Sequence, residues 1–234
     1  MALGAYACTA ITALTAQDTT GVHAIHPVPP DFIRQQIEVA LADPGADALK
    51  TGMLGDAATI EAVAQALAGI GLPLVVDPVM VAKGGAVLLR TDALAALKRV
   101  LLPLAALITP NVPEAELLTG LAVEDLPGMR RAAARLLGLG APAVLLKGGH
   151  LPGETVTDLL ATPMATLELT RPRLQTRHTH GTGCTLATAV ACGLAAGMRL
   201  PDAVNRARDY VQAAIAAAPG IGAGHGPLGH LVTL

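Results

Sequence analysis

The sequence has few aromatic residues, few cysteines and no cluster of positive charge, and each shortage excludes a class of protein. Tryptophan is absent, aromatic residues make up 1% of the chain, and 16 Lys and Arg against 18 Asp and Glu give a net charge of −2. Binding to a phosphate backbone requires clustered Lys and Arg, so we expect no nucleic-acid partner. The three cysteines, Cys8, Cys184 and Cys192, form no C-x-x-C pair and leave one unpaired. Their number and spacing argue against a disulfide framework and a zinc site.

The sequence also lacks a convincing membrane segment. The longest run without a charged residue or a histidine, residues 181–198, opens with a glycine-rich turn and carries three threonines among alanine and glycine. A buried helix explains this run better than a bilayer helix does. No basic leader followed by an apolar segment opens the sequence, which argues against a signal peptide. We therefore expect a cytoplasmic protein without membrane contact.

Hydrophobic residues are abundant, at 52% of 234 residues, which is enough to fill one large core. We expect a single domain over residues 1–234. Apolar runs of strand length alternate with stretches whose apolar residues recur at helical spacing, a pattern typical of an α/β fold with a parallel sheet. The predicted strands are residues 47–51, 72–77, 106–109 and 142–147, and the predicted helices between them are residues 31–42, 56–68, 92–102 and 126–139.

The pattern changes after residue 147. Residues 155–160 and 165–176 are predicted to be two shorter strands with an antiparallel arrangement, and two long helices are predicted over residues 184–196 and 201–217. Asp31 and Asp56 are expected to be N-caps, because a carboxylate there accepts free backbone N–H groups. Polar residues follow the predicted parallel strands, and ligands of open α/β sheets bind in the crevice beyond the strand ends. This layout favours an enzyme.

The loop Gly181-Thr182-Gly183-Cys184 directly precedes an apolar helix. Glycines let successive backbone N–H groups converge, and a helix N-terminus adds partial positive charge, so the loop can hold an anionic oxygen or phosphate. The same field is expected to lower the pKa of the Cys184 thiol, which makes it a candidate proton acceptor or nucleophile. The alternative is a structural glycine turn with a buried cysteine.

Three further segments place polar groups after predicted strands. Asn111 and Glu114 can present oxygen ligands to a magnesium ion, although the same spacing fits a helix capping box. Asp77 ends an otherwise apolar strand and is expected to emerge near the ligand crevice. Lys147, followed by two glycines, suits the close approach of a phosphate, although a turn after a strand needs glycines in any case.

Two weaker candidates complete the set. Lys83 could approach a polyphosphate, but a surface-loop lysine is usually only solvated. Met53 lies in a tight loop where a flexible, polarizable side chain could cover a flat ring, although buried methionine more often fills a core.

These segments occur in order along one chain, and together they closely resemble the hydroxymethylpyrimidine and phosphomethylpyrimidine kinases of thiamine biosynthesis, a family of the ribokinase-like superfamily. The resemblance extends from Leu3 to Pro227. It is carried by the motifs Thr12-Ala-Leu-Thr-Ala-Gln17, Thr51-Gly-Met-Leu54, Asp77-Pro-Val-Met80, Thr109-Pro-Asn-Val-Pro-Glu114, Lys147-Gly-Gly-His150 and His180-Gly-Thr-Gly-Cys184.

The resemblance implies a ribokinase-like, doubly wound α/β fold, with a mostly parallel sheet and helices on both faces. It also implies transfer of the γ-phosphoryl group of ATP to 4-amino-5-hydroxymethyl-2-methylpyrimidine and then to the monophosphate of that pyrimidine. In this family Cys184 would take the hydroxyl proton, while Gly181, Thr182 and Gly183 would form the anion hole for the transferring phosphoryl group.

The remaining roles follow the same motifs. Gln17 and Met53 match the positions that hydrogen-bond and cover the pyrimidine. Asn111 and Glu114 match the motif for Mg²⁺ and phosphate, while Asp77 and Lys147 would line the nucleotide side. The resemblance further suggests a homodimer.

One departure from the family and three alternatives remain open. Family members begin with a strand, a glycine-rich loop and a helix that helps to hold the pyrimidine, and this βα unit is missing before the first residues of the chain. The alternatives are a pyridoxal or pyridoxine kinase, a catalytically impaired pyrimidine-binding protein, and a cysteine hydrolase that uses Cys184 and His180.

Overall fold

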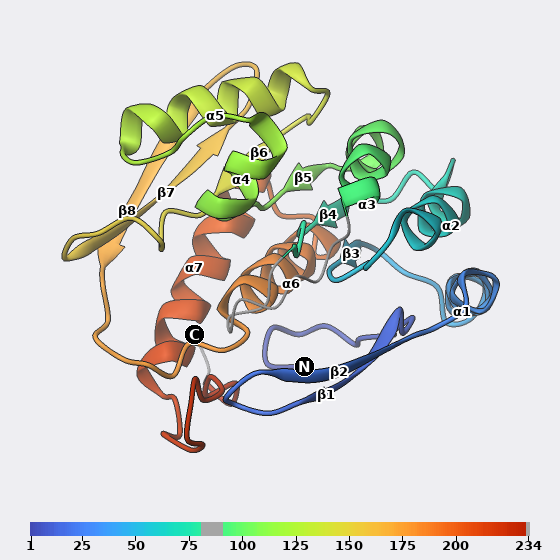
Figure 1. Ribbon diagram of the computed structural model, residues 1–234, viewed down its shortest axis with the longest axis horizontal. Helices are drawn as coiled ribbons and strands as arrows, with labels where there is room; N and C mark the ends of the chain where they lie inside the picture. The colour runs from blue at the N-terminus through green and yellow to red at the C-terminus, as the bar shows by residue number, and fades with distance from the viewer. Residues whose placement is uncertain (81–90, 233–234) are drawn as a thin grey trace.

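The computed structural model describes residues 1–80 and 91–232 and has an α/β fold built on a mixed, mostly parallel sheet (Figure 1). Six strands lie side by side in sequence order: β3 (Leu49–Thr51), β4 (Leu74–Val76), β5 (Leu107–Ile108), β6 (Val144–Leu146), β7 (Thr155–Ala161) and β8 (Thr166–Pro172). The first four are parallel, and β7 and β8 continue the sheet antiparallel. This confirms the predicted strands and the antiparallel pair. The expectation that β7 and β8 are the shorter strands was wrong, since each has seven residues.

Seven α-helices accompany the strands in the described part of the chain: α1 (Pro30–Ala42), α2 (Ala57–Leu67), α3 (Thr91–Ala96), α4 (Val112–Thr119), α5 (Leu126–Gly138), α6 (Thr182–Ala195) and α7 (Leu200–Ala216). The predicted helix over residues 92–102 divides, because α3 continues as a π-helical turn, η1 (Leu97–Leu101), and a 3₁₀ turn, η2 (Leu102–Leu104).

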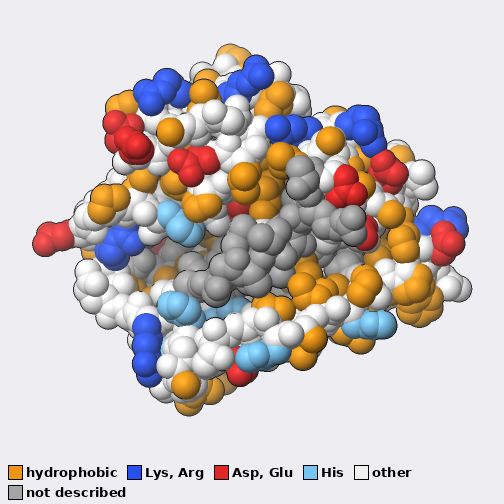
Figure 2. All heavy atoms as spheres, viewed as in Figure 1, with side chains coloured by type: hydrophobic (Ala, Val, Ile, Leu, Met, Phe, Trp, Pro, Cys, Tyr) orange, Lys and Arg blue, Asp and Glu red, His pale blue; other side chains and the backbone are white. Residues whose placement is uncertain are grey.

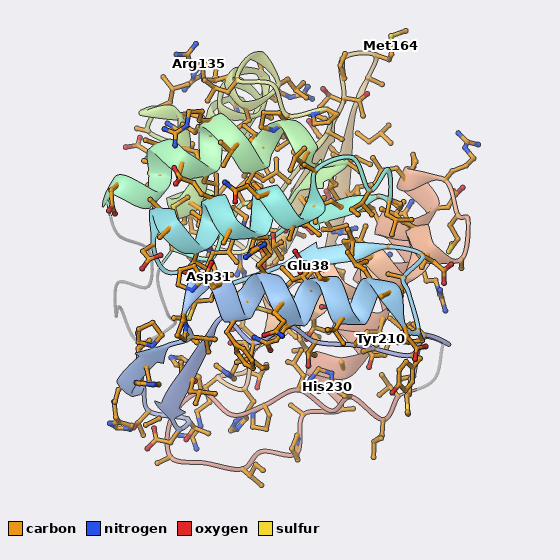
Figure 3. The ribbon with its side chains drawn as sticks, turned by 90° about the vertical axis from the view of Figure 1, so that its right-hand side faces the viewer. Asp31, Glu38, Arg135, Met164, Tyr210 and His230 are labelled. Atoms are coloured by element: carbon orange, nitrogen blue, oxygen red, sulfur yellow. The ribbon has the colours of Figure 1, made fainter. Side chains whose placement is uncertain are left out.

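The two predicted N-caps have different outcomes. Asp56 caps α2 as expected, with its carboxylate accepting the Thr59 N–H at 2.9 Å. The prediction for Asp31 was wrong, because Pro29 holds the N-cap position of α1 and Asp31 lies in the first turn. Proline there lets α1 begin without a side-chain cap. Asp31 instead forms an exposed ion pair with Arg34 at 3.7 Å on the outer side of α1 (Figure 3).

The sheet is buried on both faces, because successive residues of a strand point to opposite sides. In β4, Leu74 and Val76 belong to the core formed with α2, α3, α4 and α5, whereas Val75 belongs to the core formed with α6 and α7. Figure 1 shows these two helix layers on either side of the strands. Side chains that follow the parallel strands therefore emerge at one common edge, between the two layers.

A β-hairpin outside the main sheet had no counterpart in the prediction. It consists of β1 (Ala13–Gln17) and β2 (Val22–Pro27), and its turn contacts the glycine-rich C-terminal tail (Figure 1). The Thr19 carbonyl accepts the His225 N–H at 2.7 Å, and a Cβ added to Gly224 would lie 2.1 Å from that same oxygen. Glycine at position 224 thus permits the close approach of the hairpin and the tail.

In the part of the chain that the structure describes, no helix is long and apolar enough to cross a membrane. The uncharged run over residues 181–198 forms α6, whose Leu186, Ala187 and Val190 are buried against the sheet. Lys83 lies outside the described residues.

Candidate active site

The N-terminus of α6 provides free backbone donors. Gly181 is the N-cap and has φ +81°, a left-handed conformation that glycine adopts without strain. The Thr182 hydroxyl donates to the Thr179 carbonyl at 2.7 Å and so braces the turn. No side chain caps α6 within the described residues. The Thr182 N–H donates to the Thr179 carbonyl at 3.4 Å, a long hydrogen bond, and the N–H groups that follow it in the first turn face the ligand side without a side-chain acceptor. Together with the helix dipole, these donors favour an anion at this point.

Lys147 brings a positive charge to the same place. Its ammonium lies 2.9 Å from the carboxylate of Asp77, which is 2% exposed and also accepts the Thr109 hydroxyl at 3.0 Å. A Cβ added to Gly183 would lie only 3.0 Å from the Lys147 Nζ. Gly183 therefore leaves the space in which the Lys147 ammonium meets the first turn of α6. This contact joins the loop at the end of β6 to the predicted anion site.

Glu114 lies next to Lys147 and belongs to the cap of α4. The Asn111 side chain accepts the Glu114 N–H at 2.9 Å, and the Glu114 carboxylate accepts the Asn111 N–H at 2.7 Å, which completes a capping box. Burial raises the pKa of Glu114 to about 7, although the Lys147 ammonium 4.0 Å away opposes this shift. Desolvation also disfavours the charge on Lys147, but the neighbouring carboxylates of Asp77 and Glu114 raise its pKa above the ordinary value.

The oxygen ligands at this site, the carboxylates of Asp77 and Glu114, suit a magnesium ion only when a nucleotide supplies further ligands. Mg²⁺ usually binds one or two carboxylates plus substrate phosphates and water, and the carboxylates of Asp77 and Glu114 fit that pattern. The Asn111 amide oxygen is already engaged in the capping box, which leaves Asn111 less suited to bind the ion directly. Among residues 1–80 and 91–232, no three His, Cys, Asp or Glu side chains gather into a metal cage.

The expected effect of the helix N-terminus on Cys184 was wrong in sign. Cys184 is exposed at one side, but protein atoms surround the sulfur enough that desolvation raises the pKa of the thiol above its ordinary value. Lys50 and Lys147 oppose this rise, whereas Asp77 adds to it through its charge and through a hydrogen bond from the thiol. Cys184 is therefore a thiol in the ligand-free protein. The charged neighbours of the thiol are thus Lys50, Lys147 and Asp77, whereas a Cys184–His180 hydrolase would require the His180 ring beside the sulfur.

The two predicted pyrimidine-binding residues belong to different elements of the fold. Met53 is half-buried in the loop after β3, and its carbonyl accepts the Thr12 hydroxyl at 2.7 Å. Gln17 is the exposed last residue of β1, in the hairpin outside the main sheet. Met53 thus follows a strand of the main sheet, at the edge that carries the charged cluster, whereas Gln17 belongs to the hairpin.

Sequence reasoning missed three residues around this edge. Lys50 of β3 is close enough to Cys184 to affect its pKa, and its signal was a lysine in a strand otherwise read as buried. Arg208 and Asp158 form a buried ion pair at 2.8 Å beneath the Lys147 loop, with Asp158 accepting the Gly148 N–H at 2.9 Å. The signal for Arg208 was a single arginine on the apolar side of α7, between Ala207 and Val211.

Free N–H donors, an ammonium and two carboxylates that meet beyond the ends of parallel strands are suited to position a phosphoryl group and neutralise its charge. The class of protein that this fold and site define is a small-molecule kinase. A family model described as phosphomethylpyrimidine kinase matches residues 1–229. The chain therefore belongs to the phosphomethylpyrimidine kinase family, as its motifs indicated.

Individual relatives agree with this assignment. The hydroxymethylpyrimidine/phosphomethylpyrimidine kinase of Bacillus subtilis is 46% identical over 230 residues, which cover 97% of this chain and 85% of that protein. The thiamine biosynthesis bifunctional protein ThiED of Geobacter sulfurreducens is 49% identical over 231 residues, and this chain spans 98% of its own length but 47% of that protein. A solved ADP complex of Bacillus subtilis pyridoxal kinase superposes with a TM-score of 0.91 at 35% identity, covering 98% of this chain and 88% of that one.

Proposed function

We propose that this chain transfers the γ-phosphoryl group of ATP to the hydroxymethyl group of 4-amino-5-hydroxymethyl-2-methylpyrimidine, and then phosphorylates the resulting monophosphate, in thiamine biosynthesis. The observation that carries this proposal is the meeting of Cys184, Lys147 and Asp77 at the N-terminus of α6. It is supported by the kinases of this specificity that are similar to the chain along almost its whole length.

Each residue has a distinct task in this reaction. The N–H groups around Gly181, Thr182 and Gly183 hold the oxygens of the transferring phosphoryl group, and Lys147 compensates their charge. Cys184 lies beside that position, where it can accept the proton of an attacking hydroxyl group. Because desolvation favours the protonated thiol, the cations around Cys184 are needed to make the thiolate accessible.

The other assignments belong to the same proposal. Met53 covers the pyrimidine ring, Gln17 hydrogen-bonds it, and Asp77 with Asn111 lines the nucleotide side. Magnesium, held by Glu114 with the nucleotide phosphates, would supply charge neutralisation. A ribokinase-like, doubly wound single domain over residues 1–234, a homodimeric assembly and a cytoplasmic location are further parts of the proposal.

A second candidate is pyridoxal kinase activity, which the superposition on a pyridoxal kinase favours. Its identity to this chain is 35%, compared with 46% for the hydroxymethylpyrimidine kinase of the same organism. Identity in sequence reports on side chains in the pocket more directly than backbone superposition does, so we place the pyrimidine first.

A direct assay tests the proposal. The purified chain is incubated with ATP, Mg²⁺ and either the hydroxymethylpyrimidine or pyridoxal, and ADP release is measured for both acceptors. We expect the higher kcat/KM with the pyrimidine, and Cys184→Ala should remove most turnover while leaving ATP affinity nearly unchanged. Faster turnover of pyridoxal would replace our first choice by the second. Pyrimidine binding without ADP release would instead indicate a pyrimidine-binding protein without kinase activity.

A further inference from the structure

Lys50 is a cation at the active site to which the roles above give only an electrostatic effect on the Cys184 thiol. The chain has four lysines, at positions 50, 83, 98 and 147, and two of the three that the structure describes, Lys50 and Lys147, lie at one sheet edge. In the parallel register Lys50 is opposite Val75, whose side chain belongs to the core under α6 and α7. Residues opposite each other in register point to the same face of a sheet. The Lys50 side chain therefore lies on the face covered by α6.

The position of the Lys50 ammonium is fixed further by the loop after β3. A Cβ added to Gly52 would lie 2.9 Å from the Lys50 Nζ, so the side chain runs along the strand toward its C-terminal end and passes over Gly52. That end carries Met53 on one side and faces Cys184 on the other, since α6 packs against β3. The ammonium thus lies at the end of β3, close enough to Cys184 to affect the pKa of its thiol, and Met53 follows in the next loop.

The two active-site lysines differ in their charge partners. Lys147 is 2.9 Å from Asp77 and 4.0 Å from Glu114. Within the described residues the Lys50 side chain forms no ion pair and no hydrogen bond, and Lys50 is half-buried. A half-buried cation without a counter-ion is unfavourable on its own, and an anionic ligand would complete it. The hydroxymethyl acceptor is neutral and cannot do so, whereas the phosphate of the phosphomethyl acceptor can.

The two phosphoryl transfers also differ in what they require of the enzyme. In the first transfer a hydroxyl oxygen attacks the γ-phosphorus, the bond from that phosphorus to the bridging oxygen of ADP breaks, and the hydroxyl proton must be accepted. In the second transfer the attacking oxygen belongs to a phosphate that is already ionised near neutral pH. The same bond breaks, but no proton needs to be removed. Cys184 thus has a task in the first transfer, and a neutralising cation is needed in the second.

We propose that Lys50 binds the phosphate of the phosphomethyl acceptor, so that the enzyme uses Cys184 chiefly for its first transfer and Lys50 chiefly for its second. This inference rests on the proposed function. It adds a residue that distinguishes the charged acceptor from the neutral one within a single site.

The test compares both acceptors in the same proteins. Initial rates with ATP and Mg²⁺ are measured for the hydroxymethylpyrimidine and for its monophosphate, using wild type, Lys50→Met, Cys184→Ser and Lys98→Met. Methionine keeps the apolar part of the lysine stem. Lys98 is the matched control, because it is also a half-buried lysine but lies in η1, away from the site. The expected change in the kcat/KM ratio follows from the free energy of a hydrogen bond to a charged group.

We expect Lys50→Met to lower the ratio of kcat/KM for the monophosphate to kcat/KM for the hydroxymethyl acceptor by about tenfold to a hundredfold. Cys184→Ser should change the ratio in the opposite direction, and Lys98→Met should not change it. Equal losses with both acceptors in Lys50→Met would overturn the inference while leaving the proposed function intact. A wild-type protein that phosphorylates the hydroxymethyl acceptor but not its monophosphate would also overturn it. Inactivity of wild type toward both acceptors would overturn the proposed function itself.

Discussion

The buried ion pair between Arg208 and Asp158 should be decisive for stability. Arg208 is 6% exposed and Asp158 is 7% exposed, and the guanidinium also donates to the Leu169 carbonyl. Replacing Arg208 by methionine leaves the Asp158 carboxylate buried without its counter-ion. Removing one partner of a buried pair costs about 3–5 kcal/mol. For a chain of this length that corresponds to a fall in Tm of about 6–20 °C.

Urea unfolding of wild type and Arg208→Met measures this difference directly. Arg99→Met is a suitable control, because the Arg99–Glu61 pair is 61% and 46% exposed at its two side chains. Exposed pairs contribute about 0–1 kcal/mol, so the control should unfold almost as wild type does.

A second variant separates the charge from the hydrogen bond. Asp158→Asn combined with Arg208→Met removes both charges but keeps a side-chain oxygen for the Gly148 N–H. The double variant should therefore recover most of the stability lost in Arg208→Met, since a neutral pair leaves no buried charge uncompensated. A loss below about 1 kcal/mol for Arg208→Met, or a double variant less stable than that single one, would refute the reasoning.

Two further predictions concern the active site. Gly183→Ala should lower the rate of phosphoryl transfer at least tenfold without lowering Tm, because the added methyl group would lie 3.0 Å from the Lys147 Nζ. Gly138→Ala is the control, since an added methyl group there meets open space and should leave turnover unchanged. Equal activities of the two variants in a kinase assay would contradict this prediction. Glu114→Gln keeps the capping box and should remove a pH dependence of stability. Folding raises the pKa of Glu114 from 4.5 to about 7, so the folded state holds the proton more tightly than the unfolded state does. Wild type should therefore lose stability relative to Glu114→Gln as the pH rises from about 4.5 to about 7. The total loss should be about 3 kcal/mol. Unfolding curves in urea at several pH values, without metal or nucleotide, measure this difference, and a difference independent of pH would contradict it.

Much of the sheet could be predicted because its strands are apolar on both faces. Segments such as Leu74–Val76 and Val144–Leu146 are short runs of aliphatic residues with a glycine or proline nearby, and this pattern indicates a strand buried between two helix layers. The hairpin of β1 and β2 lacked that signal. Most of its residues are exposed and it forms no part of either core, so periodicity could not identify it.

The residues of the site could be predicted better than their electrostatic states. Local motifs identified Asp77, Lys147 and Cys184, since each follows a strand or begins a helix. The sign of the shift at Cys184 depended instead on distances between segments far apart in the sequence. A helix N-terminus alone favours a thiolate, but the desolvation of the sulfur and the nearby Asp77 carboxylate outweigh that effect here. The choice between a capping box and a magnesium site at Asn111 was equally beyond the sequence, because one spacing serves both.

The distribution of lysine explains how a chain with a net charge of −2 can still bind polyphosphates. Without a basic surface the attraction must be local, and the strand ends concentrate it: Lys147 between Asp77 and Glu114, and Lys50 beside Cys184. Because the carboxylates of Asp77 and Glu114 already neutralise Lys147, its ammonium attracts a nucleotide phosphate less strongly than an unpaired cation would. The backbone N–H donors of α6 must therefore supply part of the binding free energy. Lys50 has no carboxylate partner among residues 1–80 and 91–232. Replacing Lys50 should therefore change kcat/KM by an amount that depends more strongly on the charge of the acceptor than replacing Lys147 does.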